Sequence, residues 1–291
     1  DVLVVGGGIS GIMAAKLSAE NNNETLLLDD KNTLGGTTIY QNNDCFKIDD
    51  NHTNYWLEKE IKNIKNIKNL TIKTRTSLAA YHGYNYLLAK ENITDHLSPD
   101  ERKGKIRQRL WKIRAKKVII ATGSIERPLI FNNNDRPGIM LSSAIKKFID
   151  FYGVKTGKEI SLFTNNDSAY ETAISLKKSG VNIVSIIDIR DKSSSKVVKE
   201  VEKHNIKIYW NHTIVNTEGY RRISFIEIMK LSDDGSGVIG KKIKLKTDCL
   251  GISGGWTPMV HLFTQSGGKL KFRSDDNVFL PDKNKTPSDQ I

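Results

Sequence analysis

A glycine-rich loop near the start of the chain offers backbone amides, rather than reactive side chains, for chemistry. The segment Gly6-Gly-Gly-Ile-Ser-Gly11 follows the apolar run Val2-Leu-Val-Val5 and matches the pattern G-x-G-x-x-G. In this pattern Gly6 permits a tight turn, Gly8 lets the backbone touch a pyrophosphate, and Gly11 lets a helix lie close to the strand. The loop predicts a site for the ADP part of a dinucleotide on a helix N-terminus. The alternative is a glycine-rich turn without a ligand.

Two carboxylates stand at the end of the next apolar strand. Asp29 and Asp30 are placed to accept hydrogen bonds from the adenosine ribose hydroxyls. A carboxylate at this point also repels a 2′-phosphate, which favours NAD or FAD over NADP, although Lys31 weakens that preference. The residues themselves leave the choice between NAD and FAD open.

Three further segments fit the same site, and packing alone also explains each of them. The first segment would place small residues beside the pyrophosphate, and the second would bring backbone groups to the adenine. The third is the turn after the return strand Val118-Ile-Ile120, a strand that we expect to be buried and parallel. These residues are Gly36 and Thr37; Ser77 and Leu78; and Ala121, Thr122 and Gly123.

A second loop of this kind has lost its glycines. In Thr164-Asn-Asn-Asp-Ser-Ala169, Thr164 and Asn166 occupy the first two glycine positions. A β-carbon at Asn166 should obstruct the close approach of a pyrophosphate. We therefore expect the second domain to keep the fold but to bind a second pyridine nucleotide poorly.

Other catalytic patterns are missing from the sequence. It contains no C-x-x-C, which excludes disulfide chemistry of the thioredoxin-reductase type, and no G-x-S-x-G, H-E-x-x-H or Walker loop. The two cysteines, Cys45 and Cys249, are far apart, and the six histidines are scattered. We predict no catalytic residue and no metal site on this chain, and a reducing, cytoplasmic location.

Composition restricts the partners. The 291 residues carry a net charge of +12, yet lysines are spread along the chain. The densest basic stretch, residues 102–117, leads into an apolar strand and is more typical of a solvated hairpin than of a phosphate-binding face. No apolar run approaches the length of a membrane span. We expect neither nucleic acid nor membrane as a partner.

The elements that must position these residues form two similar units. Apolar runs and turns predict strand, helix and strand at 1–5, 9–20 and 25–29, and again at 159–163, 167–179 and 181–188, with Gly180 as a helix C-cap. Between and after them we expect a helix over 56–67, strands over 69–74, 78–89 and 107–120, and a meander over 206–250.

This order predicts an α/β chain with a tandem Rossmann-like fold, that of two-dinucleotide-binding-domain oxidoreductases of the pyridine-nucleotide/FAD type, with antiparallel strand insertions. The turn-rich segment 132–138 places the boundary. We expect a first dinucleotide-binding domain over 1–131, completed by 246–291, and a second, NAD(P)H-domain-like one over 132–245. A strand starting at residue 1 without an initiator Met suggests a segment of a longer protein.

Several longer strings resemble the α subunits of heterotetrameric sarcosine oxidases, and the likeness covers essentially the whole chain. They are residues 91–97, 107–128, 134–140, 163–170, 253–258 and 261–268. The resemblance implies NAD bound to this chain through Ser10, Asp29, Asp30, Lys31, Thr37 and Leu78.

The resemblance also implies the reaction and the assembly. Sarcosine would be oxidised to glycine, hydrogen peroxide and formaldehyde, or methylene-tetrahydrofolate when folate is present. FAD would lie in a β subunit, FMN at the α/β interface, and tetrahydrofolate in a separate domain, with further small subunits completing the complex. The alternatives are the α subunit of an FAD-dependent opine or amino-acid dehydrogenase, and a non-catalytic scaffold stabilised by its dinucleotide.

Overall fold

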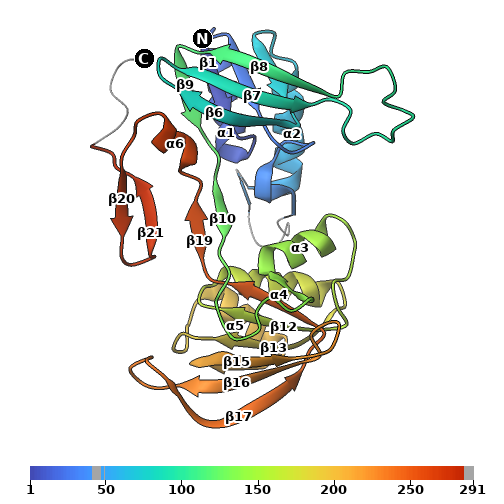
Figure 1. Ribbon diagram of the computed structural model, residues 1–291, viewed down its shortest axis with the longest axis vertical. Helices are drawn as coiled ribbons and strands as arrows, with labels where there is room; N and C mark the ends of the chain where they lie inside the picture. The colour runs from blue at the N-terminus through green and yellow to red at the C-terminus, as the bar shows by residue number, and fades with distance from the viewer. Residues whose placement is uncertain (41–46, 49, 285–291) are drawn as a thin grey trace. The chain divides into compact units, whose positions relative to one another are not determined.

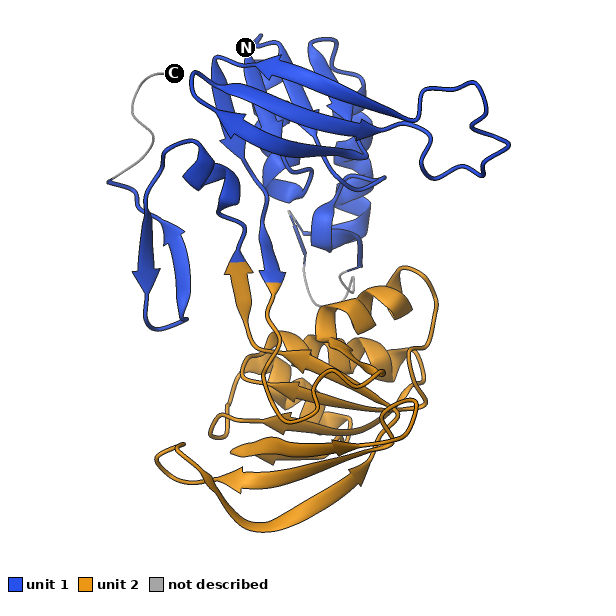
Figure 2. Cartoon of the chain, in the orientation of Figure 1, with its two compact units in different colours: residues 1–125, 258–291 blue, residues 126–257 orange. Residues whose placement is uncertain are grey.

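The chain folds into two compact units, distinguished by colour in Figure 2. The computed structural model describes residues 1–40, 47–48 and 50–284. Unit 1 combines Asp1–Ile125 with Pro258–Ile291, and unit 2 is the continuous segment Glu126–Thr257.

Unit 1 is built on a four-stranded parallel sheet of order β5-β2-β1-β9, of which β1 and β9 are labelled in Figure 1. Helices α1 and α2 bury one face of it, where Val4, Leu27, Ile12 and Ile64 belong to one apolar cluster. The strand expected to be buried at 118–120 lies at the sheet edge, so Ile119 stays 37% exposed. The elements are β1 (Val2–Val5), α1 (Ile9–Glu20), β2 (Thr25–Leu28), η1 (Gly36–Tyr40), β3 (Lys47–Ile48), β4 (Asn51–His52), α2 (Thr53–Lys65), β5 (Leu70–Lys73) and β9 (Lys117–Ile120).

An antiparallel sheet packs on the opposite face of the parallel one. Its order is β6-β7-β8, formed by Thr76–His82, Tyr86–Asn92 and Gln108–Arg114. The single strand expected over 78–89 is wrong, because Tyr84 and Asn85 take positive φ angles and turn the chain into a hairpin. The strand expected over 107–120 is also wrong: it is two strands, β8 and β9, in different sheets. Unit 1 ends with α6 (His261–Gln265), β20 (Leu270–Arg273) and β21 (Val278–Pro281).

Unit 2 repeats the plan with a five-stranded parallel sheet of order β11-β18-β12-β13-β14. Apolar clusters bury both faces, one beneath the helices and one beneath a three-stranded antiparallel sheet. The elements are β11 (Ile139–Leu141), α3 (Ser142–Asp150), β12 (Glu159–Thr164), α4 (Ser168–Lys178), β13 (Asn182–Asp188), α5 (Lys196–Lys203), β14 (Ile208–Trp210), β15 (His212–Glu218), β16 (Phe225–Leu231), β17 (Val238–Lys246) and β18 (Cys249–Ser253).

The predicted details of unit 2 hold in part. Gly180 follows α4 with φ +69°, and its amide donates to the Lys177 carbonyl, which confirms the C-cap. The meander expected over 206–250 is limited to β15–β17, because β14 and β18 join the parallel sheet.

The chain passes between the units through β10 (Ser124–Glu126) and β19 (Trp256–Pro258), which pair with each other. The expected boundaries, 131/132 and 245/246, therefore differ from the observed ones. The turn-rich segment belongs to unit 2, since Thr217 Oγ1 donates to the Asn133 carbonyl at 3.0 Å and Arg136 bonds to the same threonine. The two parallel sheets with antiparallel additions confirm the predicted fold class. No helix in the described part of the chain is long and apolar enough to cross a bilayer.

Candidate dinucleotide-binding site

Two of the three motif glycines are required by the protein's own packing. A β-carbon on Gly11 would lie 1.7 Å from the Gly6 carbonyl oxygen, so no other residue lets α1 start this close to β1. Gly6 has φ +104°, and a β-carbon there would lie 2.3 Å from the Ala121 carbonyl oxygen. These contacts agree with the turn and packing roles predicted for the motif.

Gly8 is different, because nothing in the described protein requires it to be a glycine. Its φ of −72° and ψ of −177° suit any L-residue. A β-carbon added to it would meet no described atom within 4 Å. Gly36 lies beside it, with a built β-carbon 3.1 Å from the Gly8 Cα. The bare backbone of Gly8 therefore faces open space at the position where the motif predicts a pyrophosphate.

The N-terminus of α1 supplies the matching electrostatics. The first backbone bond of the helix runs from the Ile12 amide to the Gly8 carbonyl, so the amides of Ile9, Ser10 and Gly11 precede the intrahelical ladder. The first turn holds no acidic residue, and Ser10 is exposed. Together with the helix dipole this end favours an anion.

The two predicted ribose carboxylates face different surroundings. Asp29 is buried: its Oδ2 accepts from the Gly7 amide at 2.5 Å and its Oδ1 from the Lys31 amide at 2.7 Å. Burial raises the pKa of the Asp29 carboxyl, and the two amide bonds oppose that shift. Asp30 is exposed and pairs with Lys31 Nζ at 2.8 Å, so its side chain is accessible to a ligand.

Gly7 is a residue that the motif does not mark. A β-carbon there would lie 2.8 Å from Asp29 Oδ2 and 2.4 Å from Leu34 Cδ2. The middle glycine of the triplet is thus needed so that Asp29 can reach the loop amide. The signal in the sequence was the run of three glycines, in which Gly7 is the one that the motif leaves open.

The remaining predicted residues gather around the same strand ends. The start of β6, which carries Ser77 and Leu78, is tied to the Asp29 segment by the Thr76 amide, which donates to the Asp29 carbonyl at 2.8 Å. Ala121 continues β9 with a bond to Val5, Thr122 Oγ1 donates to the Met259 carbonyl, and Gly123 accepts from the Met259 amide. Thr37 is exposed at the start of η1.

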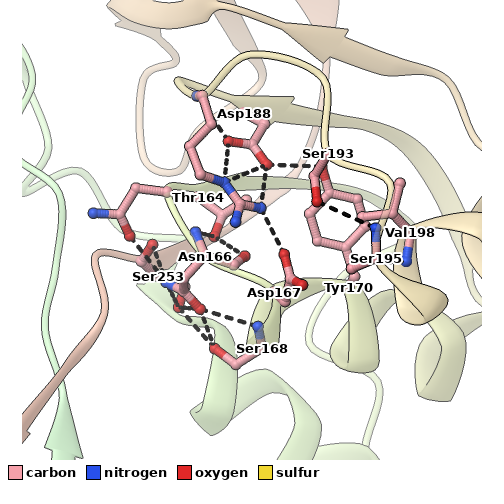
Figure 3. A network of polar contacts seen from close by, with 12 residues as sticks. Thr164, Asn166, Asp167, Ser168, Tyr170, Asp188, Ser193, Ser195, Val198 and Ser253 are labelled. Atoms are coloured by element: carbon pink, nitrogen blue, oxygen red, sulfur yellow. Dashed lines mark hydrogen bonds and ion pairs between the residues drawn. The ribbon is translucent and has the colours of Figure 1, made fainter. Parts of the chain in front are cut away.

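In unit 2 the corresponding loop is occupied by its own side chains (Figure 3). Asn166 Nδ2 donates to the Ser253 carbonyl at 3.1 Å and to Ser253 Oγ at 3.0 Å. Its Oδ1 accepts from the Ser168 amide at 3.0 Å, the first amide of α4. The asparagine side chain thus uses a donor that an anion would need.

The acidic residue at the end of β13 is also engaged (Figure 3). Asp188 is fully buried, and its Oδ2 accepts from Tyr170 at 2.8 Å and from Arg190 at 2.8 Å. Arg190 reaches on to Asp167 at 2.8 Å. Burial, with Asp188 adding to it, raises the pKa of Tyr170, so this hydroxyl remains a donor. Asp188 has no free oxygen turned toward a ribose in this arrangement.

The described part of the chain offers few side chains for redox or metal chemistry. Cys249 is free and fully buried, and burial raises the pKa of its thiol. Cys45 lies outside the described residues. No group of three or more His, Cys, Asp or Glu in the described ranges is arranged to hold a metal ion. The candidate site of unit 1 thus offers binding groups rather than reactive ones.

The chain is similar to proteins of known families. The family model of pyridine nucleotide-disulphide oxidoreductases matches residues 1–291. The chain is 34% identical, over 97% of its length, to the sarcosine oxidase subunit alpha of Corynebacterium sp. (strain P-1), and 29% identical, over 96%, to that of Rhizobium meliloti (strain 1021). It covers 29% and 27% of those two relatives.

Solved structures show the same fold. L-proline dehydrogenase from P. horikoshii superposes with a TM-score of 0.71 at 22% identity, covering 100% of this chain and 49% of that one. Thioredoxin reductase from T. acidophilum gives 0.69 at 20% identity, covering 96% and 88%.

Proposed function

Because the chain belongs to the pyridine nucleotide-disulphide oxidoreductase family, we propose that its unit 1 binds a dinucleotide, NAD in preference to FAD, through the loop at residues 6–11. The geometry of Gly8 carries the proposal: within the G-x-G-x-x-G loop, at the N-terminus of α1, its bare backbone borders open space that a ligand can enter and that a side chain at this position would fill. The exposed carboxylate of Asp30 would accept the ribose hydroxyls and disfavour a 2′-phosphate.

The wider role follows from the similarity to sarcosine oxidase subunit alpha. We propose that the chain is the dinucleotide-holding region of a cytoplasmic enzyme that oxidises sarcosine to glycine. Hydrogen peroxide and formaldehyde or methylene-tetrahydrofolate would be the other products. FAD and FMN would be held with a β subunit, and folate elsewhere in the α subunit. This region would then bind and orient NAD through backbone amides and the Asp30 carboxylate.

Substitution of Gly8 by Val tests the site. The backbone angles accept valine and no described atom obstructs it, so the fold should survive while the pyrophosphate loses its place. We expect bound NAD, measured after denaturing the purified protein, to fall from about one equivalent to background. Gly83→Val is the matched control, because Gly83 is equally uncrowded and lies outside the site. If the Gly8 variant co-purifies with stoichiometric dinucleotide, the site is misplaced; a yellow wild-type protein would instead identify the dinucleotide as FAD.

The loop of unit 2 predicts that there is no second nucleotide site. Asn166 already bonds to Ser253 and to the Ser168 amide. Calorimetric titration of the chain with NADPH should therefore show no tight, saturable binding beyond the site in unit 1. Tight NADPH binding that persists in the Gly8→Val variant would contradict this.

A further inference from the structure

Gly7 is held on both sides by hydrogen bonds within the protein. Its amide donates to Asp29 Oδ2 at 2.5 Å, and its carbonyl accepts from the Gly35 amide at 2.7 Å. The second carboxylate oxygen of Asp29 accepts from the Lys31 amide at 2.7 Å. The backbone that leads into Gly8 is therefore fixed between two segments, and the Asp29 carboxylate provides one of the two attachments.

The amides that follow Gly7 are the donors predicted to bind a diphosphate. The Gly8 carbonyl accepts the first helical bond, from Ile12, whereas the amides of Gly8, Ile9 and Ser10 donate to no group in the described part of the chain. A carbonyl and the N–H of the next residue share one peptide plane and point in opposite directions. Fixing the Gly7 carbonyl therefore also fixes the direction of the Gly8 amide, the first of these donors.

The two bonds of Asp29 require its ionised form. Each carboxylate oxygen faces an N–H donor; protonation leaves one strong acceptor oxygen, and an asparagine would turn an NH2 group toward one of the two amides. Asp29 is buried, so little water can replace a lost bond. Burial raises the pKa of the Asp29 carboxyl, and the two amide bonds oppose that shift. The charge is therefore lost at a higher pH than that of an ordinary aspartate.

Other titratable side chains lie near this carboxylate. Asp30 and Lys31, on its own segment, act on its charge and pair with each other at 2.8 Å. The elements packed around that segment bring Lys73 of β5, Arg75 in the turn after β5, and Tyr40 at the end of η1. The first turn of α1 brings no acidic residue. Asp29 is the carboxylate that bonds to the glycine loop.

We propose that Asp29 is a positioning residue of the nucleotide site: its carboxylate, acting through Gly7, orients the amides that bind the diphosphate, so that nucleotide binding depends on its charge. The sequence predicts a ribose contact for Asp29, and the proposal leaves that contact to Asp30. It rests on the proposed function, which makes the loop at residues 6–11 a dinucleotide site.

The test separates an effect on the diphosphate from a contact with the ribose. NAD, and an NAD analogue that lacks both hydroxyls of the adenosine ribose, are titrated by calorimetry into the full chain freed of its nucleotide. Asp29→Asn should raise the dissociation constant of both ligands about tenfold or more, because the loss is at the diphosphate. Asp30→Ala should weaken NAD and leave the analogue at its wild-type affinity. Asp191→Asn, the same change at an exposed aspartate of unit 2, is the matched control and should alter neither.

The pH dependence of NAD binding is the second measurement. If the ionised fraction alone binds, the dissociation constant of the wild-type chain should approach about a tenfold rise per pH unit below the pKa of Asp29. Asp30→Ala should keep this component, and Asp29→Asn should lack it. Circular dichroism restricts the comparison to pH values at which every variant is folded.

Each outcome supports or overturns the proposal. Wild-type affinity of folded Asp29→Asn for both ligands would restrict Asp29 to a role in stability and overturn it. Weakening of NAD alone by Asp29→Asn would place the carboxylate on the ribose and overturn it as well. Equal pH profiles of the wild type and Asp29→Asn would remove the dependence on charge. A wild-type chain that binds neither ligand would instead refute the proposed function, and the role of Asp29 with it.

Discussion

Asp29 and Asp30 are neighbours with separate tasks. Asp29 is 7% exposed and spans two backbone amides, one in the glycine loop and one after β2. Asp30 faces solvent beside Lys31. A buried acceptor shapes the loop, and an exposed one is left for a ligand, so changes at the two positions should have different effects.

Replacing each aspartate by alanine should separate these tasks. Asp30→Ala should leave the unfolding free energy within ~0.5 kcal/mol and weaken NAD binding roughly tenfold to a hundredfold, because charged hydrogen bonds contribute about 1.5–3 kcal/mol. Asp29→Ala leaves the Gly7 and Lys31 amides without their acceptor and should lower the unfolding free energy by about 1–3 kcal/mol. Calorimetry and urea denaturation measure both. Unchanged NAD affinity in Asp30→Ala would show that the ribose is held elsewhere.

At the level of elements, apolar runs and glycine turns in the sequence predicted α1 and the strands β1 and β2. Both signals are local, so they can be read without knowing the rest of the fold. The predictions of single strands over 78–89 and 107–120 were wrong because they relied on the same local signals. The turn at Tyr84 and Asn85 was overlooked because apolar residues continue on both sides of it, although Gly83 and Asn85 are residue types that turns favour. The bond between the Gly7 amide and the Asp29 carboxylate was not predicted, because it joins two segments 22 residues apart and no local pattern encodes such a contact.

The hydrogen bond between Tyr170 of α4 and Asp188 of β13 is a second contact that no local pattern encodes, and its contribution to stability can be tested. Tyr170 is fully buried, and its hydroxyl donates to the buried Asp188. Tyr170→Phe should lower the unfolding free energy by about 1–3 kcal/mol, since it removes one donor from a buried carboxylate. Tyr220→Phe is the control, because Tyr220 is 92% exposed. Equal urea midpoints for the two variants would mean that Arg190 alone satisfies Asp188.

On the scale of the whole molecule, unit 2 is a continuous segment with its own apolar clusters on both faces of its sheet. Such a segment is expected to fold by itself. Residues 126–257, expressed alone, should give a cooperative melting transition that NAD does not shift. In the full chain, NAD at a hundredfold excess over its dissociation constant should stabilise unit 1 by about 2.7 kcal/mol. An NAD-dependent shift in the isolated segment would relocate the site to unit 2.

The split of unit 1 around unit 2 also sets an order of events on the ribosome. Unit 2 has been synthesised completely before the residues that finish unit 1 emerge, among them Gln265, whose side chain accepts from the Tyr81 amide, and Met259, which bonds to Thr122 and Gly123. Domains generally fold as units as they are made. The glycine loop, although made before unit 2, must therefore wait in an unfinished unit, and the nascent chain should acquire its nucleotide only after the segment from Pro258 onward has emerged.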